Sequence, residues 1–328
     1  MYLKTKNPKI VVVGGGTGLS ILLKGLKKFT SNITAIVTVA DDGGGSGVLR
    51  EDLGMLPPGD IRACMLALAN TEPTMEKLFQ YRFEDGMLKG QSFGNIFIAA
   101  MNGVYGNFET AIKEASNVLA ITGKVYPMTL ENVIISAELH NGKIIKGESH
   151  ISKGSTAEKS KIKRVSIEPD IINPLPEALE AIREADFIVL GPGSLYTSVI
   201  PNLLVGDIIN EICKAKAPKA YIVNVMTEPG ETDGYSIIDH VDAILKHSRG
   251  DILDYVIANT EEIPKNILQR YERDGSVPVI IKEDDERKLA GKGITLIGNS
   301  LVYIEKDYIK HNNIKLSELL IHLEENRP

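Results

Sequence analysis

Two glycine-rich stretches of the sequence carry the groups that proteins use to hold phosphate. The first follows four apolar residues, in IVVVGGGTGLS, and consists of Gly14, Gly15, Gly16, Thr17 and Gly18. The second follows the apolar run DFIVL and contains Gly191, Gly193, Ser194, Tyr196, Thr197 and Ser198. Glycines let the backbone approach a ligand closely, and N–H groups and hydroxyls donate to phosphate oxygens with little net positive charge. Two such loops predict a diphosphate, or two separately bound phosphates.

Neither loop matches a complete nucleotide-binding motif. Leu19 stands at the position where the dinucleotide fingerprint has its third glycine. The Gly-Lys-Ser/Thr of a P-loop is also missing from the sequence. Two plainer interpretations therefore stay open. The first loop also fits an ordinary turn from a strand to a helix, and the hydroxyls of the second also fit a cluster of helix N-cap residues.

Three aspartates offer oxygen ligands near the first loop. Asp41 and Asp42 end the apolar run ITAIVTVA, and Asp60 follows PPG. Carboxylates are ligands that Mg²⁺ accepts alongside phosphate and water, and acids after a second parallel strand also bind ribose hydroxyls. Asp60 has a further interpretation, because it fits the N-cap of a helix expected at residues 61–70.

Other polar side chains complete the candidate site. Arg62 is a candidate for a phosphate contact, and Tyr196 either stacks on a base or simply packs. The amides of Asn95, Asn224 and Asn259 can pair with hydroxyl or acetamido groups or with the edges of uracil. The six histidines form neither a catalytic triad nor a HExxH pair, so the sequence gives no support to nucleophilic or zinc-dependent hydrolysis.

The elements that must position these residues alternate between strand and helix. Apolar runs of strand length stand at residues 10–13, 33–40, 186–190, 220–225 and 255–258. Helical spacing between them predicts an α/β fold, Rossmann-like and doubly wound, with a mostly parallel sheet and helices on both faces. In such a sheet ligands bind beyond the carboxyl ends of the strands, which is where both loops, Asp41, Asn224 and Asn259 fall.

One stretch departs from this alternation. Residues 125–167 resemble an antiparallel β insertion, with a hairpin of residues 133–139 and 143–150 closed by a type I′ turn at Asn141 and Gly142. No low-complexity linker divides the chain. We therefore expect a single ligand-binding domain over residues 1–328 with this insertion.

Composition narrows the class of protein. With 328 residues, 43% of them hydrophobic, the chain can build a full core. A net charge of −6 argues against a general nucleic-acid binder, which needs a basic surface. The two cysteines, Cys64 and Cys213, suggest a reducing compartment, and no apolar run approaches the roughly 20 residues of a membrane span. We expect a cytoplasmic protein without a membrane span.

Several long motifs together resemble the gluconeogenesis factor (YvcK-like) family of bacteria. These are VVVGGGTGLSILLKGLK, ITAIVTVADDGGGSGVLR, PPGDIRACMLALAN, SFGNIFIAAM, LGPGSLYTSVIPNLL and NVMTEPGETDGYSIIDHVDAI, which extend over nearly the whole chain. That family is similar in fold to the 2-phospho-L-lactate transferases. One small departure is the triple glycine at residues 43–45, where GGSSG is expected, and it affects only the detail of that loop.

The resemblance implies a bacterial cytoplasmic regulator that binds UDP-sugars, UDP-N-acetylglucosamine in particular. It implies a link between carbon metabolism, gluconeogenic growth, cell-wall synthesis and cell shape, exerted through a protein partner that the sequence does not identify. No established catalysis and no required cofactor come with it. From the transferases it carries over Mg²⁺ beside a nucleotide diphosphate, near acids that correspond in motif to Asp42 and Asp60, with Asp41 an alternative to Asp42.

Three hypotheses follow from these observations. The first is the UDP-sugar-binding regulator, expected as a homodimer because such folds commonly dimerise. The second is a Mg²⁺-dependent transferase that acts on a phosphorylated or nucleotide-activated substrate. The third is an NAD-dependent oxidoreductase, which the absent third glycine and the second phosphate loop make the weakest.

Overall fold

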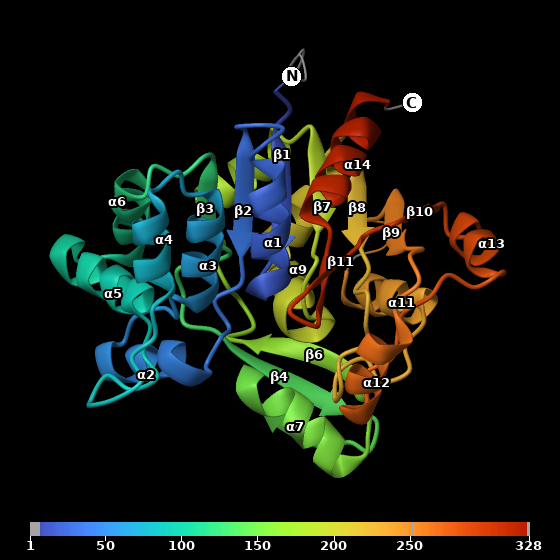
Figure 1. Ribbon diagram of the computed structural model, residues 1–328, viewed down its shortest axis with the longest axis horizontal. Helices are drawn as coiled ribbons and strands as arrows, with labels where there is room; N and C mark the ends of the chain where they lie inside the picture. The colour runs from blue at the N-terminus through green and yellow to red at the C-terminus, as the bar shows by residue number, and fades with distance from the viewer. Residues whose placement is uncertain (1–6, 249, 251, 327–328) are drawn as a thin grey trace.

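A seven-stranded parallel sheet forms the centre of the molecule in the computed structural model, which describes residues 7–248, 250 and 252–326 (Figure 1). Its strand order is β10-β9-β8-β7-β1-β2-β3. The strands are β1 (Ile10–Gly14), β2 (Ile33–Val37), β3 (Lys124–Pro127), β7 (Phe187–Leu190), β8 (Lys219–Ile222), β9 (Tyr255–Asn259) and β10 (Thr295–Asn299). From β1 the chain runs outward to β2 and β3, then returns to β7 on the other side of β1, so the strand order reverses between β1 and β7. The α/β doubly wound fold expected from the sequence is confirmed.

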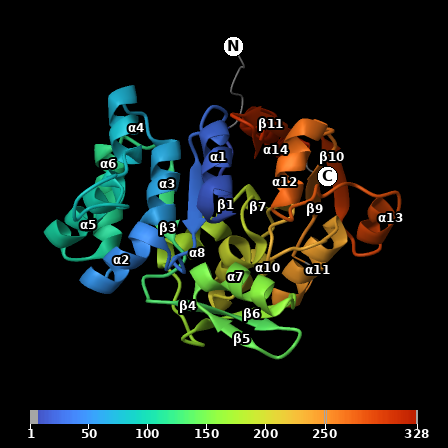
Figure 2. The same cartoon turned by 60° about the horizontal axis from the view of Figure 1, so that its bottom comes forward.

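Helices cover both faces of this sheet, because every residue of β1 and of β7 is buried and must be shielded from water on two sides (Figures 1 and 2). In one layer α1 packs between α3 and α14, and in the opposite layer α8 packs against α10. The helices are α1 (Gly16–Leu26), α2 (Gly44–Leu53), α3 (Gly59–Leu68), α4 (Pro73–Gln80), α5 (Phe93–Tyr105), α6 (Phe108–Val118), α8 (Pro176–Arg183), α9 (Ile200–Leu203), α10 (Gly206–Lys214), α11 (Ile237–His247), α12 (Lys265–Arg273), α13 (Asp285–Ala290) and α14 (Asn313–Glu325), with a π-helix η1 (Leu195–Val199) before α9.

A small antiparallel sheet lies below the carboxyl ends of the main strands, with one helix against it (Figure 1). It has the order β5-β4-β6, formed by β4 (Ile134–Leu139), β5 (Ile144–Lys146) and β6 (Ile162–Glu168), and α7 (Glu148–Glu158) packs on β4 and β5. The expected second hairpin strand therefore ends early, at Lys146, and α7 takes the residues that follow. Residues 125–127, which the sequence places at the start of the insertion, belong to β3 and pair with β2 in the main sheet.

The hairpin turn differs from the expected type I′ turn. Such a turn needs positive φ at both central residues, and only Gly142, at 86°, has it, whereas Asn141 does not. The N–H of Gly142 donates to the carbonyl of Leu139 over 2.9 Å, and Leu139 and Lys143 pair across the loop. The connection is therefore a three-residue loop of residues 140–142, in which the side chain of Asn141 accepts from the N–H of Lys143 at 3.0 Å.

The last third of the chain adds a hairpin beside the site. Strands β11 (Val302–Glu305) and β12 (Tyr308–His311) pair antiparallel, and β12 lies against α1. Residues 277–281 form no regular strand, and their pairing is limited to an isolated bridge between Met226 and Pro278. Within the part of the chain that the structure describes, no helix has the length and apolar character needed to cross a membrane.

Candidate functional site

The first glycine loop joins β1 to α1 and leaves the start of that helix without a side-chain cap. Gly15 is the N-cap residue, and the first turn of α1 holds no acidic residue, so its N–H groups are offered to a ligand. One of them has a partner, because the N–H of Gly16 donates to Asp60 Oδ2 over 2.8 Å. Gly16 has a φ of 69°, a conformation that favours glycine.

The second loop joins β7 to η1 and lies directly against the first. A Cβ at Gly18 would stand 2.7 Å from the carbonyl oxygen of Pro192, and one at Gly193 would stand 3.0 Å from that of Gly15. Asn202 fixes the two loops together, since its Nδ2 donates to Gly14 O at 3.2 Å and to Ser198 O at 2.8 Å. The two glycine loops therefore form one continuous surface at the point where the strand order reverses.

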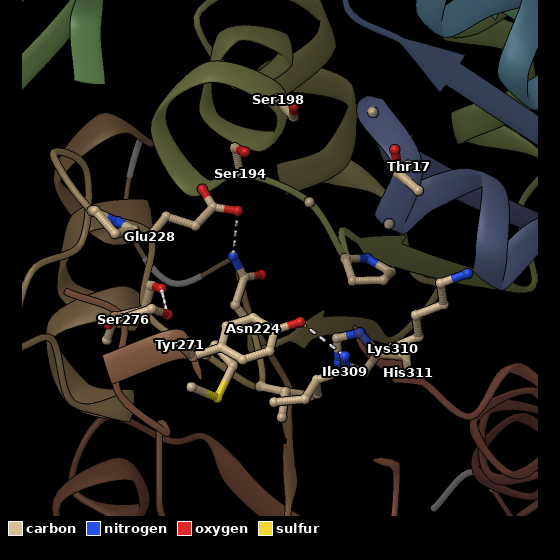
Figure 3. A pocket seen from close by; sticks show the side chains of 18 of the residues that line it. Thr17, Ser194, Ser198, Asn224, Glu228, Tyr271, Ser276, Ile309, Lys310 and His311 are labelled. Atoms are coloured by element: carbon tan, nitrogen blue, oxygen red, sulfur yellow. Dashed lines mark hydrogen bonds between the residues drawn. The ribbon is translucent and has the colours of Figure 1, made fainter. Parts of the chain in front are cut away.

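A cavity of about 530 Å³ opens beside the two loops (Figure 3). One wall is made by the loops themselves, with the side chains of Thr17, Ser194 and Ser198. The rest of the lining comes from three segments that are distant in the sequence, namely the loop after β8, the end of α12 and strand β12. Their lining residues are Asn224, Val225, Met226, Thr227, Glu228, Pro229, Tyr271, Asp274, Ser276, Ile309, Lys310 and His311. The cavity thus has a wall of backbone and hydroxyl donors opposite a wall that is partly apolar.

The far wall is held in place by its own hydrogen bonds. The hydroxyl of Tyr271 accepts from the N–H of Ile309 at 2.8 Å, and the hydroxyl of Ser276 donates to the carbonyl of Thr227 (Figure 3). His311 is partly buried, and desolvation lowers its pKa to about 4, so the imidazole is neutral at physiological pH. These bonds bring three separate segments to one rigid surface.

The aspartates of the candidate site lie beside this cavity and not in its lining. Asp41 Oδ1 accepts from the N–H of Gly43 at 2.9 Å, and Asp42 Oδ1 accepts from the N–H of Ser149 at 2.8 Å, at the start of α7. Asp60, in the first turn of α3, is joined to the first glycine loop through Gly16. Burial raises the pKa of Asp60 to about 6, and the nearby charge of Asp41 adds to this. Asp42 therefore links β2 to the insertion, and Asp60 supports the loop.

A second group of polar residues lies on the β2 side of the loops. Arg62 Nε donates to Asn95 Oδ1 over 2.8 Å, and Asn95 Nδ2 donates to Ser46 Oγ over 3.4 Å. Burial lowers the pKa of Arg62, which stays a cation at neutral pH. Arg62 and Asn95 thus contact each other but do not line the cavity that the two loops share.

Three other candidates, Tyr196, Thr197 and Asn259, lie outside the lining of the cavity. The hydroxyl of Tyr196 lies 2.8 Å from that of Tyr235, and Thr197 Oγ1 donates to Glu231 Oε1 over 3.3 Å. Asn259 Oδ1 accepts from the N–H groups of Glu261 and Leu301, which ties β9 to the start of β11. Of the predicted residues, the cavity is lined by Gly16, Thr17, Gly18, Gly193, Ser194, Ser198 and Asn224.

Three glutamates near the site, of which Glu231 is buried and Glu148 and Glu228 are partly buried, were not among the sequence candidates. Glu228 lines the cavity, while Glu148 and Glu231 both contact Thr197 in η1, and burial raises their pKa values to about 7 and about 8. Glu228 and Glu231 stand in TEPGET, in the loop that follows β8, so their position after a strand was a usable signal. Glu148 opens α7 in the insertion, and no local pattern connects it with the main sheet.

Known proteins resemble this chain over nearly its whole length. The family model described as 2-phospho-L-lactate transferase CofD matches residues 10–302. A putative gluconeogenesis factor from Thermoanaerobacterium thermosulfurigenes is 59% identical over 96% of this chain and 97% of its own. The gluconeogenesis factor of Bacillus subtilis is 47% identical over 97% and 98%.

A solved structure agrees with this family assignment. A crystal structure of a UPF0052 family member from Bacillus halodurans superposes with a TM-score of 0.91 at 48% identity, covering 95% of this chain and 99% of its own. Sequence and fold thus agree from β1 to the last hairpin. The chain belongs to the gluconeogenesis factor family, within the wider family of the 2-phospho-L-lactate transferase CofD.

Proposed function

We propose that this protein binds a UDP-sugar, with UDP-N-acetylglucosamine as the expected ligand, and acts as a regulator and not as a catalyst. The observation that carries the proposal is the contact between the two glycine loops at one wall of the cavity of about 530 Å³. That volume is within the range of about 300–1,000 Å³ typical of small-molecule sites. A diphosphate bound there would receive hydrogen bonds from both loops.

The opposite wall supports a nucleoside at the other end of the ligand. Met226, Tyr271 and Ile309 give it an apolar surface, and the Tyr271 ring is fixed through its hydroxyl. Flat apolar walls of this kind suit the face of a base such as uracil. This division of the cavity favours an orientation in which the phosphates lie at the donor wall and the base lies at the apolar wall.

The regulatory part of the proposal rests on the relatives and on the sequence motifs. Relatives that share about half or more of their residues with this chain are named gluconeogenesis factors, which supports a role in carbon metabolism. A cytoplasmic location, a link to cell-wall synthesis and cell shape, a homodimer and a protein partner are proposed with it. The ligand would report the supply of a cell-wall precursor.

A magnesium ion is proposed only alongside a bound diphosphate. No group of three or more His, Cys, Asp or Glu among the described residues is arranged to hold a metal, but Mg²⁺ typically uses one or two carboxylates together with phosphate and water. Asp60, which contacts the first loop, and Asp42 are the acids that would hold it. The ion would neutralise phosphate charge there.

Isothermal titration calorimetry with millimolar UDP-N-acetylglucosamine tests this proposal. We expect saturable binding, and no comparable heat with NAD. Absence of binding by protein shown to be folded by circular dichroism would overturn it. Turnover of a nucleotide sugar in the presence of Mg²⁺ would instead support the transferase alternative and contradict a purely regulatory role.

A further inference from the structure

The far wall of the cavity holds two buried acceptor atoms that have no hydrogen-bond partner. They are Asn224 Oδ1 and Glu228 Oε2. Asn224 is only 8% exposed, and both residues follow β8 at the edge of the cavity (Figure 3). Buried acceptors are nearly always paired in native proteins, because an unpaired one has lost its water and gained nothing in return. A ligand that donates hydrogen bonds to these two atoms would satisfy both acceptors.

The other atoms of the pair are already engaged. Asn224 Nδ2 donates to Glu228 Oε1 over 3.4 Å, and the hydroxyl of Ser194 is a hydrogen-bonding partner of the same carboxyl. What remains free on each side chain is therefore an acceptor. Burial raises the pKa of Glu228, and a hydrogen bond donated by a ligand would stabilise its carboxylate form.

Two adjacent acceptors select the chemistry of the ligand group. A phosphate is repelled by the Glu228 carboxylate, so the phosphates belong at the glycine loops. A metal ion would need further ligands, and no group of three acids, histidines or cysteines among the described residues provides them. A vicinal diol offers two hydroxyl donors, one for Asn224 Oδ1 and one for Glu228 Oε2, on side chains that are hydrogen-bonded to each other.

The position of the pair relative to the second loop indicates which diol this is. Ser194 belongs to that loop and also contacts Glu228, so a group bound by Glu228 lies next to the phosphates. In a nucleoside diphosphate, the ribose is the part adjacent to the phosphate, and the base lies beyond it. Met226 and Tyr271 form the apolar surface on which the base would then pack.

The acids that usually bind ribose hydroxyls in this fold have other hydrogen-bond partners here. In doubly wound sheets an acid after the second strand commonly binds the ribose hydroxyls. Here Asp41 and Asp42 follow β2, but they accept from backbone N–H groups of Gly43 and Ser149 and do not line the cavity. The task therefore falls to a residue after β8.

We propose that Asn224 and Glu228 bind the ribose 2′,3′-diol of the nucleotide and make the site selective for ribonucleotides over deoxyribonucleotides. This inference rests on the proposed function, because it needs a nucleoside diphosphate in the cavity. It adds a specificity-determining pair on the far wall to the phosphate loops.

The test compares UDP with 2′-deoxy-UDP by calorimetry, first on the unaltered protein. UDP carries no hexose, so any preference between the two reports the ribose alone. We expect UDP to bind at least tenfold more tightly. Equal affinity would overturn the inference while leaving the proposed function intact, whereas no binding of UDP at all would overturn both.

The variant Glu228→Gln separates a ligand contact from a structural role. It removes a buried acid, so the ligand-free protein should unfold at the same temperature or higher, yet UDP should bind more weakly and its advantage over 2′-deoxy-UDP should shrink to less than threefold. Glu272→Gln is the matched control, on an exposed residue of α12 outside the cavity lining, and it should retain both properties. Full discrimination by Glu228→Gln would contradict the assignment.

Discussion

The contact between the two glycine loops makes Gly18→Ala the most informative single substitution. Gly18 lies in the first turn of α1, where alanine would raise helix propensity by up to about 1 kcal/mol. The new Cβ, however, would stand 2.7 Å from Pro192 O and 2.9 Å from Pro192 C, both of them backbone atoms. To reach an ordinary contact of 3.4 Å, the loops must separate by about 0.7 Å.

The free-energy cost of the steric clash should exceed the gain from the higher helix propensity of alanine. Overpacking against backbone typically costs about 1–3 kcal/mol, so we expect a net loss of stability of about 1–2 kcal/mol in urea unfolding. A diphosphate held from both sides would lose contact with one loop. We therefore expect at least a tenfold weaker affinity for UDP-N-acetylglucosamine, which corresponds to about 1.4 kcal/mol.

Gly103→Ala is the control for this substitution. Gly103 lies inside α5, and no atom would stand within 4 Å of its new Cβ. The same chemical change should therefore stabilise the protein, by about 0.5–1 kcal/mol, and leave binding unchanged. A Gly18→Ala variant that binds and unfolds like the unaltered protein would refute the claim that the loops act as one surface.

Two further substitutions test the electrostatics around the site. Asp60→Asn should flatten the dependence of stability on pH. The pKa of Asp60 is about 6 in the folded state and about 4 in the unfolded chain. Ionisation of Asp60 therefore lowers the stability of the unaltered protein by roughly 3 kcal/mol as the pH rises from 4 to 6. Urea unfolding from pH 4 to 7 measures this, and parallel curves for the two proteins would contradict it. His247→Phe should cost about 1–3 kcal/mol at pH 7, because His247 Nε2 accepts from the N–H of Val165 at 2.9 Å and joins α11 to β6. Burial lowers the pKa of His247, so its contribution is present above about pH 6.5 and is lost as the pH falls. The cost of the substitution should therefore shrink at pH 5, and exposed His140→Phe should show neither effect.

The parts of the fold that the sequence predicted are those specified by local pattern. Buried β-branched runs, a glycine turn and helical spacing identify β1, α1, β7 and the loops between them, and parallel strands bring their carboxyl ends to one edge. The hairpin turn was predicted less well. The choice between a two-residue and a three-residue loop depends on the φ of Asn141, and the Asn-Gly pair is compatible with both.

The lining of the cavity could not be predicted from local sequence pattern. Asn224 and Asn259 look alike in sequence, since each ends or follows a short parallel strand, but only Asn224 lines the cavity. Asn259 Oδ1 accepts from the backbone N–H of Glu261 and from that of Leu301, which lies 42 residues away, just before β11. Strand β12 supplies Ile309 from the far end of the chain, and no spacing rule places it beside the first loop. Such contacts depend on tertiary packing.

A crystal structure of the protein with UDP-N-acetylglucosamine and Mg²⁺ tests the central claim most directly. We predict diphosphate oxygens within hydrogen-bonding distance of the N–H groups of residues 17–18 and 193–194, with the ribose hydroxyls on Asn224 and Glu228. Density for the ligand on the β2 side, around Arg62 and Asn95 and away from the joined loops, would contradict the account.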